Sequence, residues 1–340
     1  MRSPRTLVAA IAAAILSITL AACGSAENGS SGTASSASDS IAGKRIAYLT
    51  VSQSCEYCAR QANAFTSAMK MAGAEVTMSV TNFDAAEQAQ QLNQAVSTKP
   101  DIIVIWPTDN TSIIPALERI KQTTKIPVVV TTYLPRTDDT SLWAAWVGPN
   151  DKQLGVQAAQ ALIAGLKETG NGDSGSVIMV TGTPGGGSTI DRGAGFEETL
   201  KKEAPGLKIV GSQPGNWDQT QATTAAANLI SQFGKDKIVG VFAQADNMLA
   251  GAIVAAERAG YKAGTDLVAV GSDCTIEGYT NIEAGKQYGT NLQNPVVDGS
   301  TVAEITTSVL KGQKVENITY IDTPAITKAN LAECASAVGK

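Results

Sequence analysis

The feature that most constrains this fold is a regular alternation of short apolar runs and longer amphipathic runs from residue 44 onward. Buried strands are predicted for the apolar, β-branched runs RIAYLTV, DIIVIWP and IPVVVTT. Helices are predicted between them, for runs such as DAAEQAQQLNQAVS whose apolar residues recur at helical spacing. Strands that alternate with helices in this way predict parallel sheets covered by helices on both faces.

The alternation forms two consecutive blocks, and the second begins with the long helical run DKQLGVQAAQALIAGLKETG. Each block is about the size of one doubly wound domain. We therefore predict an α/β protein with two doubly wound, Rossmann-like lobes built on parallel central sheets. Ligands of open α/β sheets bind beyond the carboxyl ends of the strands, so the loops that follow strands are the candidate binding loops.

Composition excludes several classes of function. The 340 residues contain no histidine and carry a net charge of −5. A nucleic-acid partner is not expected, because phosphate binding needs a basic surface. Without histidine the chain cannot build a Ser-His-Asp or Cys-His nucleophile or a His-ligated metal site. The spacing of its five cysteines does not suggest a thiolate metal site either, and we expect no metal and no cofactor.

The N-terminus has the pattern of an exported lipoprotein. Arg2 and Arg5 precede an apolar stretch of small residues, so residues 1–22 are predicted to be a signal peptide. The stretch ends in LAACG, which closely matches the bacterial lipobox and implies cleavage before Cys23 and lipidation of its thiol. Residues 23–42 are rich in Ser, Gly and Ala and are predicted to be a flexible tether. The lipid would anchor the protein to the outer face of the cytoplasmic membrane.

The other cysteines are Cys55, Cys58, Cys274 and Cys334. An exported chain lies in an oxidising compartment, where Cys55–Cys58 and Cys274–Cys334 are plausible disulfides. The sequence does not fix this connectivity. A redox Cys-x-x-Cys motif is the alternative for the first pair.

A glycine-rich segment, GTPGGGST, follows a predicted strand. Gly182 and Gly187 have the spacing of a phosphate-binding P-loop, but Ser188 stands where the motif requires lysine. We interpret the segment as a loop that lets the backbone approach a ligand cleft and begins a helix. A phosphorylated ligand at that helix N-terminus is the alternative.

Several segments resemble periplasmic binding proteins of the ribose-binding type, the sugar receptors of ABC importers. The resemblance covers nearly all of residues 43–340. Within its last part, the Gly-x-Asp motif that ends in Asp273 is followed at the family's spacing by Ile282, Gly285 and Gln293. The segments that carry it are PDIIVIWPTDNTSIIPALERIKQTTKIPVVV, DRGAGF, VFAQADNMLAGAIVAAERAG and VGSDCTIEGYTNIEAGKQYGTNLQNPVVDG.

This resemblance implies a type I periplasmic binding protein, in which three chain crossings form a hinge and the lobes close on a ligand. The first lobe is expected at residues 43–146 plus 294–323, and the second at residues 147–293 plus 324–340. A monomer that is not an enzyme is implied, with an ABC permease and its ATPase as partners.

The resemblance also implies site residues. Tyr57 and Trp217 fall where the family sandwiches a sugar between aromatic rings, although core packing is the alternative for both. Asp273 and Gln293 match the family's ligands for sugar hydroxyl groups. A helix N-cap is the alternative role for Asp273.

Other positions depart from the ribose-binding pattern. Cys55 replaces an asparagine, Thr132 and Tyr133 replace an aspartate and an arginine, Ile190 replaces an arginine, and Ala245 replaces an asparagine. A buried hydroxyl without a partner costs about 1–3 kcal/mol, so we expect the site to reject ribose and galactose. A polyol, a deoxy sugar or a partly apolar sugar fits better. Further candidate ligand-binding residues are Cys55, Asp109, Asn110, Thr132, Tyr133, Ser188, Arg192 and Gln244.

The sequence thus predicts an extracytoplasmic solute-binding lipoprotein of a sugar-type ABC importer. A sensory receptor of the same fold is the first alternative, and an extracellular thiol oxidoreductase that uses Cys55 and Cys58 is the second. The predicted signal peptide excludes a transcription regulator of the LacI type, which shares the two-lobe core.

Overall fold

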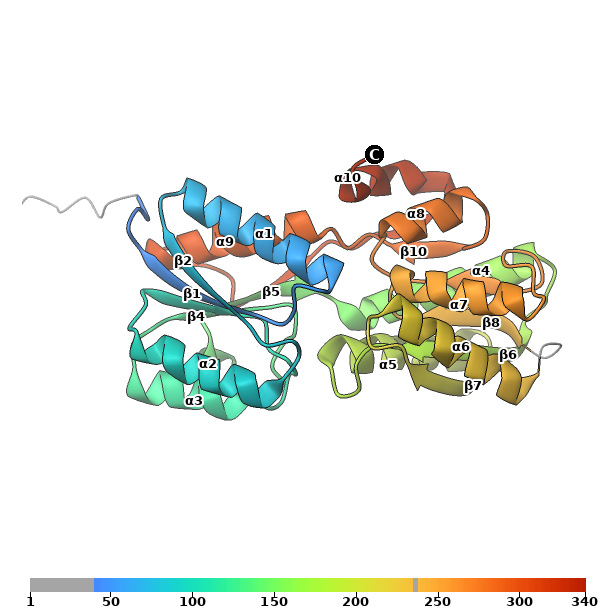
Figure 1. Ribbon diagram of the computed structural model, residues 1–340, viewed down its shortest axis with the longest axis horizontal. Coiled ribbons are helices and arrows are strands. Elements are labelled where there is room, and N and C mark those ends of the chain that lie inside the picture. The colour runs from blue at the N-terminus through green and yellow to red at the C-terminus, as the bar shows by residue number, and fades with distance from the viewer. Residues whose placement is uncertain (1–39, 235–237) are drawn as a thin grey trace, which may run out of the picture. The chain divides into compact units, whose positions relative to one another are not determined.

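A computed structural model describes residues 40–234 and 238–340 (Figure 1). The predicted signal peptide, Cys23 and most of the predicted tether lie outside the described residues. Within the described part of the chain, no helix combines the length and the apolar character that a membrane span requires.

The first lobe is built on a six-stranded sheet in the order β11-β5-β4-β3-β1-β2, and all of its strands are parallel. β3 and β4 are buried along their whole length, which explains their composition of Ile, Val and a single Thr. The strands are β1 (Arg45–Thr50), β2 (Glu75–Val80), β3 (Ile102–Ile105), β4 (Val128–Thr131), β5 (Ala145–Pro149) and β11 (Ile318–Ile321).

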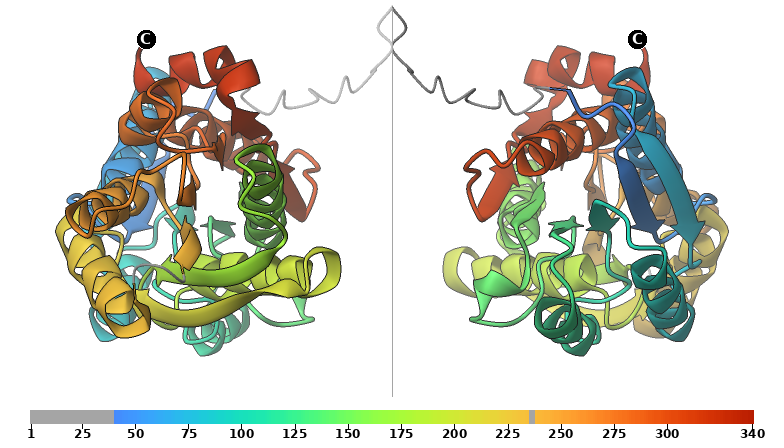
Figure 2. Two further views of the ribbon diagram at one scale, coloured as in Figure 1. Left: turned by 90° about the vertical axis from the view of Figure 1, so that its right-hand side faces the viewer. Right: turned by 90° about the vertical axis from the view of Figure 1, so that its left-hand side faces the viewer.

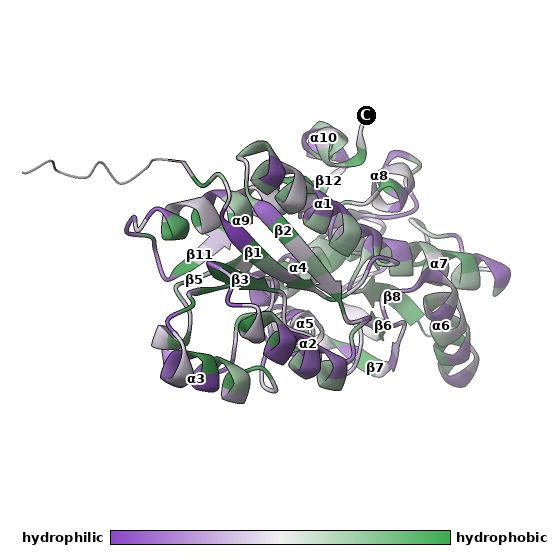
Figure 3. Ribbon diagram, turned by 60° about the vertical axis from the view of Figure 1, so that its left-hand side comes forward, coloured by the Kyte–Doolittle hydropathy of each residue, from purple (hydrophilic) through white to green (hydrophobic). Residues whose placement is uncertain are grey.

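Helices cover both faces of this sheet. α1 (Glu56–Met71) and α9 (Pro295–Leu310) pack on one face, and α2 (Ala85–Ser97) and α3 (Ile114–Thr123) on the other (Figure 1). Hydrophobic and hydrophilic residues alternate along α2 and α3, as a helix with one buried face requires (Figure 3). A short 3-10 helix, η1 (Thr140–Leu142), precedes β5.

The second lobe repeats this plan with the strand order β12-β10-β9-β8-β6-β7. α4 (Asp151–Glu168) and α5 (Gly187–Glu203) cover one face, while α6 (Gln219–Phe233) and α7 (Asp246–Arg258) cover the other (Figure 2). The strands are β6 (Ser174–Thr181), β7 (Gly206–Pro214), β8 (Ile238–Ala243), β9 (Val268–Val270), β10 (Gly289–Asn291) and β12 (Ala325–Thr327).

The two parallel-dominated sheets confirm the predicted fold class, with one difference at the edge of the second lobe. β12 runs antiparallel to β10. It follows β11 after only a short link, with no crossover helix to return the chain in the parallel direction. The C-terminal helices η3 (Lys328–Cys334) and α10 (Ala335–Val338), which the sequence analysis did not predict, pack beside α8 (Ile276–Glu283).

The chain passes between the sheets three times, after β5, after β10 and after β11. Residues 147–149 still pair with the first sheet as the end of β5. These passages bring the carboxyl ends of both sets of strands toward one region, and the candidate site lies there.

Candidate functional site

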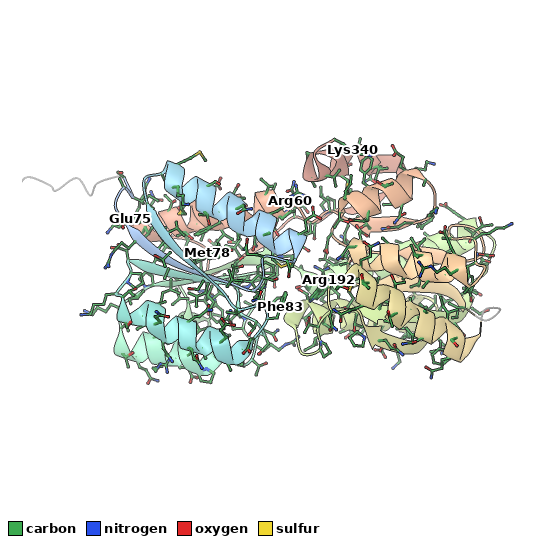
Figure 4. The ribbon with its side chains drawn as sticks, in the orientation of Figure 1. Arg60, Glu75, Met78, Phe83, Arg192 and Lys340 are labelled. Carbon is green, nitrogen blue, oxygen red and sulfur yellow. A yellow bond between two sulfur atoms is a disulfide. The ribbon has the colours of Figure 1, made fainter. Side chains whose placement is uncertain are left out.

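A cavity of about 300 Å³ lies between the lobes and is lined by residues from both of them. Its walls come largely from loops that follow strands and from the first turns of the helices after those loops. Figure 4 marks Phe83 and Arg192, which contribute to it from the first and the second lobe. The predicted residues that line the cavity are Cys55, Tyr57, Thr132, Tyr133, Ser188, Arg192, Trp217, Asp273 and Gln293.

Arg192 is the centre of the polar part of the cavity. Its side chain on α5 is only 4% exposed. Nε donates to Asp151 at 2.8 Å, and Nη1 donates to Asp273 at 2.8 Å and to the Gln244 carbonyl at 2.6 Å. Nη2 donates to Oε1 of Gln293 at 2.7 Å. Burial alone lowers the pKa of Arg192, but Asp273 and Asp151 outweigh it and raise that pKa, so the guanidinium is charged.

Asp273 lies in the loop after β9 with a positive φ of 95°. Burial raises the pKa of its carboxyl, and the neighbouring Arg192 opposes that rise. The alternative role of Asp273 as a helix N-cap is wrong, because α8 begins after Thr275 and the carboxylate of Asp273 accepts from Arg192 instead.

An aromatic wall comes from the first lobe. Tyr57, in the first turn of α1, donates its hydroxyl to Asp298 and accepts from Nε2 of Gln293 at 2.7 Å. Trp106, which follows β3, contacts Tyr57 and Tyr133 edge to face, with ring centroids 6.0 Å apart in both pairs. Aromatic side chains fixed in this way present rigid apolar surface to the cavity.

Trp217 is the aromatic residue that the second lobe contributes. It has a positive φ of 62°, and its carbonyl accepts from Nδ2 of Asn247 at 2.8 Å. Its ring lies 5.9 Å from Cζ of Arg192. A side chain at Gly182 would collide with this ring. Gly182 is therefore glycine because Trp217 lies against its backbone.

The glycine-rich segment lies against the first lobe at the start of α5. Gly187 begins the helix, and a side chain there would press on Asn110 and Tyr133 of the first lobe. Ser188 is buried and donates to Asp151 at 2.6 Å. The segment begins a helix, as the sequence analysis interpreted it, and brings the backbone of the second lobe close to the first. Its glycines are not part of the cavity lining.

Three predicted residues do not line the cavity. Asp109 accepts from the backbone N–H groups of Thr111 and Ser112, both at 2.7 Å, and so shapes the loop before α3. Gln244 is fully buried, accepting from the Gly182 N–H and donating to the Thr189 carbonyl, both at 2.9 Å. It supports the glycine-rich loop from behind. Asn110 is likewise buried and outside the lining.

Sequence reasoning missed two acids beside the cavity. Asp151 accepts from both Arg192 and Ser188, and Asp298 accepts from Tyr57. Burial raises the pKa of Asp298 well above its usual value. The sequence analysis also missed Phe83, Trp106 and Glu277, which line the cavity. The two aromatic residues follow strands, and that position was the available signal.

The cysteines pair in the structure as the sequence made plausible. Cys55 and Cys58 lie at the start of α1, with Cα atoms 5.2 Å apart, and both line the cavity. Cys274 and Cys334, with Cα atoms 6.1 Å apart, join the loop before α8 to the C-terminal helices. Their oxidation in the mature protein stays a proposal.

A sequence profile described as a periplasmic binding protein domain matches residues 46–314. The chain belongs to this family. The resemblance drawn from the sequence is thereby confirmed, and the chain is a solute-binding protein rather than an enzyme.

Named relatives and solved structures agree with this assignment. The xylitol-binding protein of Mycolicibacterium smegmatis is 31% identical over 257 residues, which is 76% of this chain and 70% of that protein. The fructose import binding protein FruE of Bifidobacterium longum is 26% identical over 98% of this chain and 97% of its own length. A carbohydrate transporter solute-binding protein from Agrobacterium radiobacter, solved with D-arabinose, is 26% identical with a TM-score of 0.78 and covers 88% of this chain and 100% of that one.

Proposed function

We propose that this protein is an extracytoplasmic solute-binding lipoprotein that captures a sugar or sugar-like molecule, such as a polyol or deoxy sugar, for an ABC importer. One observation carries the proposal. The cavity between the lobes places an aromatic residue from each lobe, Tyr57 and Trp217, beside a polar cluster of Arg192, Asp273 and Gln293. The names of the relatives, which specify xylitol and fructose, and the D-arabinose complex support a ligand of this kind.

The cavity suits such a ligand for a physical reason. The C–H faces of a sugar or polyol are apolar and pack well on the rings of Tyr57 and Trp217. Its hydroxyl groups can donate to Asp273, and a hydrogen bond to a charged acceptor is about twice as strong as a neutral one. Because these contacts come from both lobes, a ligand favours the closed arrangement.

The remaining part of the proposal concerns the export and anchoring of the protein through its N-terminus. Residues 1–22 would direct export, lipidated Cys23 would anchor the protein, and residues 23–42 would tether the lobes near the membrane. The protein would act as a monomer that presents its closed form to a permease with its ATPase. The lobe boundaries proposed are those given above, residues 43–146 plus 294–323 and residues 147–293 plus 324–340, except that residues 147–149 belong with the first sheet as the end of β5.

A sensory receptor would use the same cavity and closure, and no observation favours it over transport. The thiol oxidoreductase alternative is set aside, because the family and the named relatives are binding proteins.

A thermal-shift screen of the purified chain against sugars, polyols and deoxy sugars tests the proposal. A ligand at 100 times its dissociation constant stabilises the folded state by about 2.7 kcal/mol and so raises the melting temperature. The shift should disappear in Trp217→Ala and persist in Tyr320→Ala, which truncates an exposed aromatic residue outside the cavity. A folded protein that no compound stabilises would contradict the proposal.

A further inference from the structure

The cavity is rich in negative charge. Glu56, Asp218, Asp273 and Glu277 line it, and Arg192 is the only cation among the described lining residues. That cation is already committed, since Asp151, Asp273, Gln293 and the Gln244 carbonyl accept from its three nitrogen atoms. Glu56 pairs with Arg60 at 3.8 Å, so Asp218 and Glu277 are the carboxylates of the lining for which the described residues supply no ion-pair partner.

Several neutral donors that line the cavity already have partners within the protein. The hydroxyl of Tyr57 donates to Asp298, and the hydroxyl of Ser188 donates to Asp151. The side-chain amide of Gln293 donates one of its two N–H groups to the hydroxyl of Tyr57. Two indole N–H groups of the same lining, Nε1 of Trp106 and Nε1 of Trp217, are buried and have no partner within the described part of the chain. The hydroxyl oxygens of a sugar or polyol can accept from them.

Two acceptors of the cavity are open as well. Oδ2 of Asp273 and Oε1 of Glu277 have no hydrogen bond within the described part of the chain; the bonds recorded for these carboxylates involve their other oxygen atoms. Glu277 is half-buried in the first turn of α8, where its Oε2 accepts from the hydroxyl of Thr275 at 2.6 Å. Both open acceptors lie on the second lobe.

An ammonium group matches the two open carboxylate oxygens better than a hydroxyl group. It has three donors and no acceptor. Asp273 already pairs with Arg192, but a neutral ligand that closes the cavity takes the carboxylate of Glu277 away from water without supplying a charge in return. An ammonium supplies that charge, and the aromatic side chains of the same cavity add a further attraction for a cation.

We propose that the ligand is an amino sugar or amino polyol, with its protonated amine bound by Asp273 and Glu277 in the cavity between the lobes. This inference rests on the proposed function and names the ligand class. Asp273 also holds Arg192, so Glu277 is the residue whose charge can be removed with least effect on the other contacts.

Titration calorimetry at neutral pH on the full chain tests this inference with matched pairs of compounds. The pairs are glucose with glucosamine, galactose with galactosamine, and xylitol with 1-amino-1-deoxyxylitol, and N-acetylglucosamine serves as an uncharged amine derivative. We expect at least one amine to bind about tenfold or more tightly than its hydroxyl partner. That advantage should shrink in high salt and vanish on N-acetylation, since both weaken the charge interaction.

Two variants of α8 locate the effect. Glu277→Gln keeps the shape of the side chain and removes its charge, so it should remove most of the preference for the amine. Glu283→Gln removes the same charge from the end of the same helix, where Glu283 pairs with Lys340 outside the cavity, and should leave the preference intact. Melting temperatures of both variants establish that they are folded.

The outcomes separate this inference from the proposed function. If the hydroxyl compounds bind as tightly as the amines or more tightly, the inference is overturned while the proposed function stands. If no compound of either set binds the folded protein, both are overturned. A preference for the amine that survives in Glu277→Gln overturns the assignment of Glu277.

Discussion

Arg192 holds the cavity together at the scale of single residues, because it lies between two buried acids of the second lobe. Replacing it by methionine would leave Asp151 and Asp273 close together without a cation. Removing one partner of a buried ion pair costs about 3–5 kcal/mol, so we expect Arg192→Met to lower the free energy of unfolding by that order. Urea denaturation measures this loss.

The exposed pair Lys152–Glu198 provides the control for this prediction. Its nitrogen and oxygen lie 2.7 Å apart, but both side chains are more than half exposed. Lys152→Met should therefore change the free energy of unfolding by less than about 1 kcal/mol. Equal losses in the two variants would show that Arg192 does not stabilise the fold through its buried partners.

The sequence predicted some residues of the site and missed others. Asp273, Gln293, Tyr57 and Trp217 were predicted through a family resemblance, and all four line the cavity. Asp151 was missed because an acid in the first turn of a helix is ordinary in a sequence. Only the folded chain shows that Asp151 contacts a residue of the next helix, 41 positions away.

At the scale of elements, the alternation of apolar and amphipathic runs predicted both sheets and their covering helices. It did not predict the direction of β12 or the C-terminal helices. The direction depends on which sheet the chain joins after β11, and no local pattern records that choice. The segment after β12 begins with a capping box between Thr327 and Asn330, whose side-chain contacts appear only in the folded chain.

The two cysteine pairs should differ in their effect on stability. Cys274 and Cys334 are 60 positions apart, whereas Cys55 and Cys58 are 3 apart. If stabilisation arises from loop closure, the long loop contributes roughly 4 kcal/mol and the short one roughly 2 kcal/mol. We expect the double serine variant of Cys274 and Cys334 to unfold at lower urea concentration than that of Cys55 and Cys58. The reverse order would show that loop closure does not set their contributions.

At the scale of the whole molecule, contacts between the two lobes can stabilise the closed arrangement that we propose. Arg136, which follows β4, pairs with Asp191 of α5 at 2.5 Å. Arg60 of α1 donates to the carbonyl of Ala337 in α10 at 2.6 Å. Neither Arg136 nor Asp191 lines the cavity, so their pair can influence a ligand only through the relation between the lobes.

We therefore expect Arg136→Ala to weaken binding of the tightest compound in the calorimetric panel without altering its contacts. The pair is partly exposed, and such pairs contribute at most about 1 kcal/mol, so the dissociation constant should rise by up to about fivefold. Lys152→Ala removes an ion pair within the second lobe and should leave affinity unchanged. An affinity in Arg136→Ala equal to that of the unmodified protein would mean that this contact does not favour the closed form. A loss in both variants would point to general surface charge instead, because Arg136→Ala and Lys152→Ala change the net charge equally.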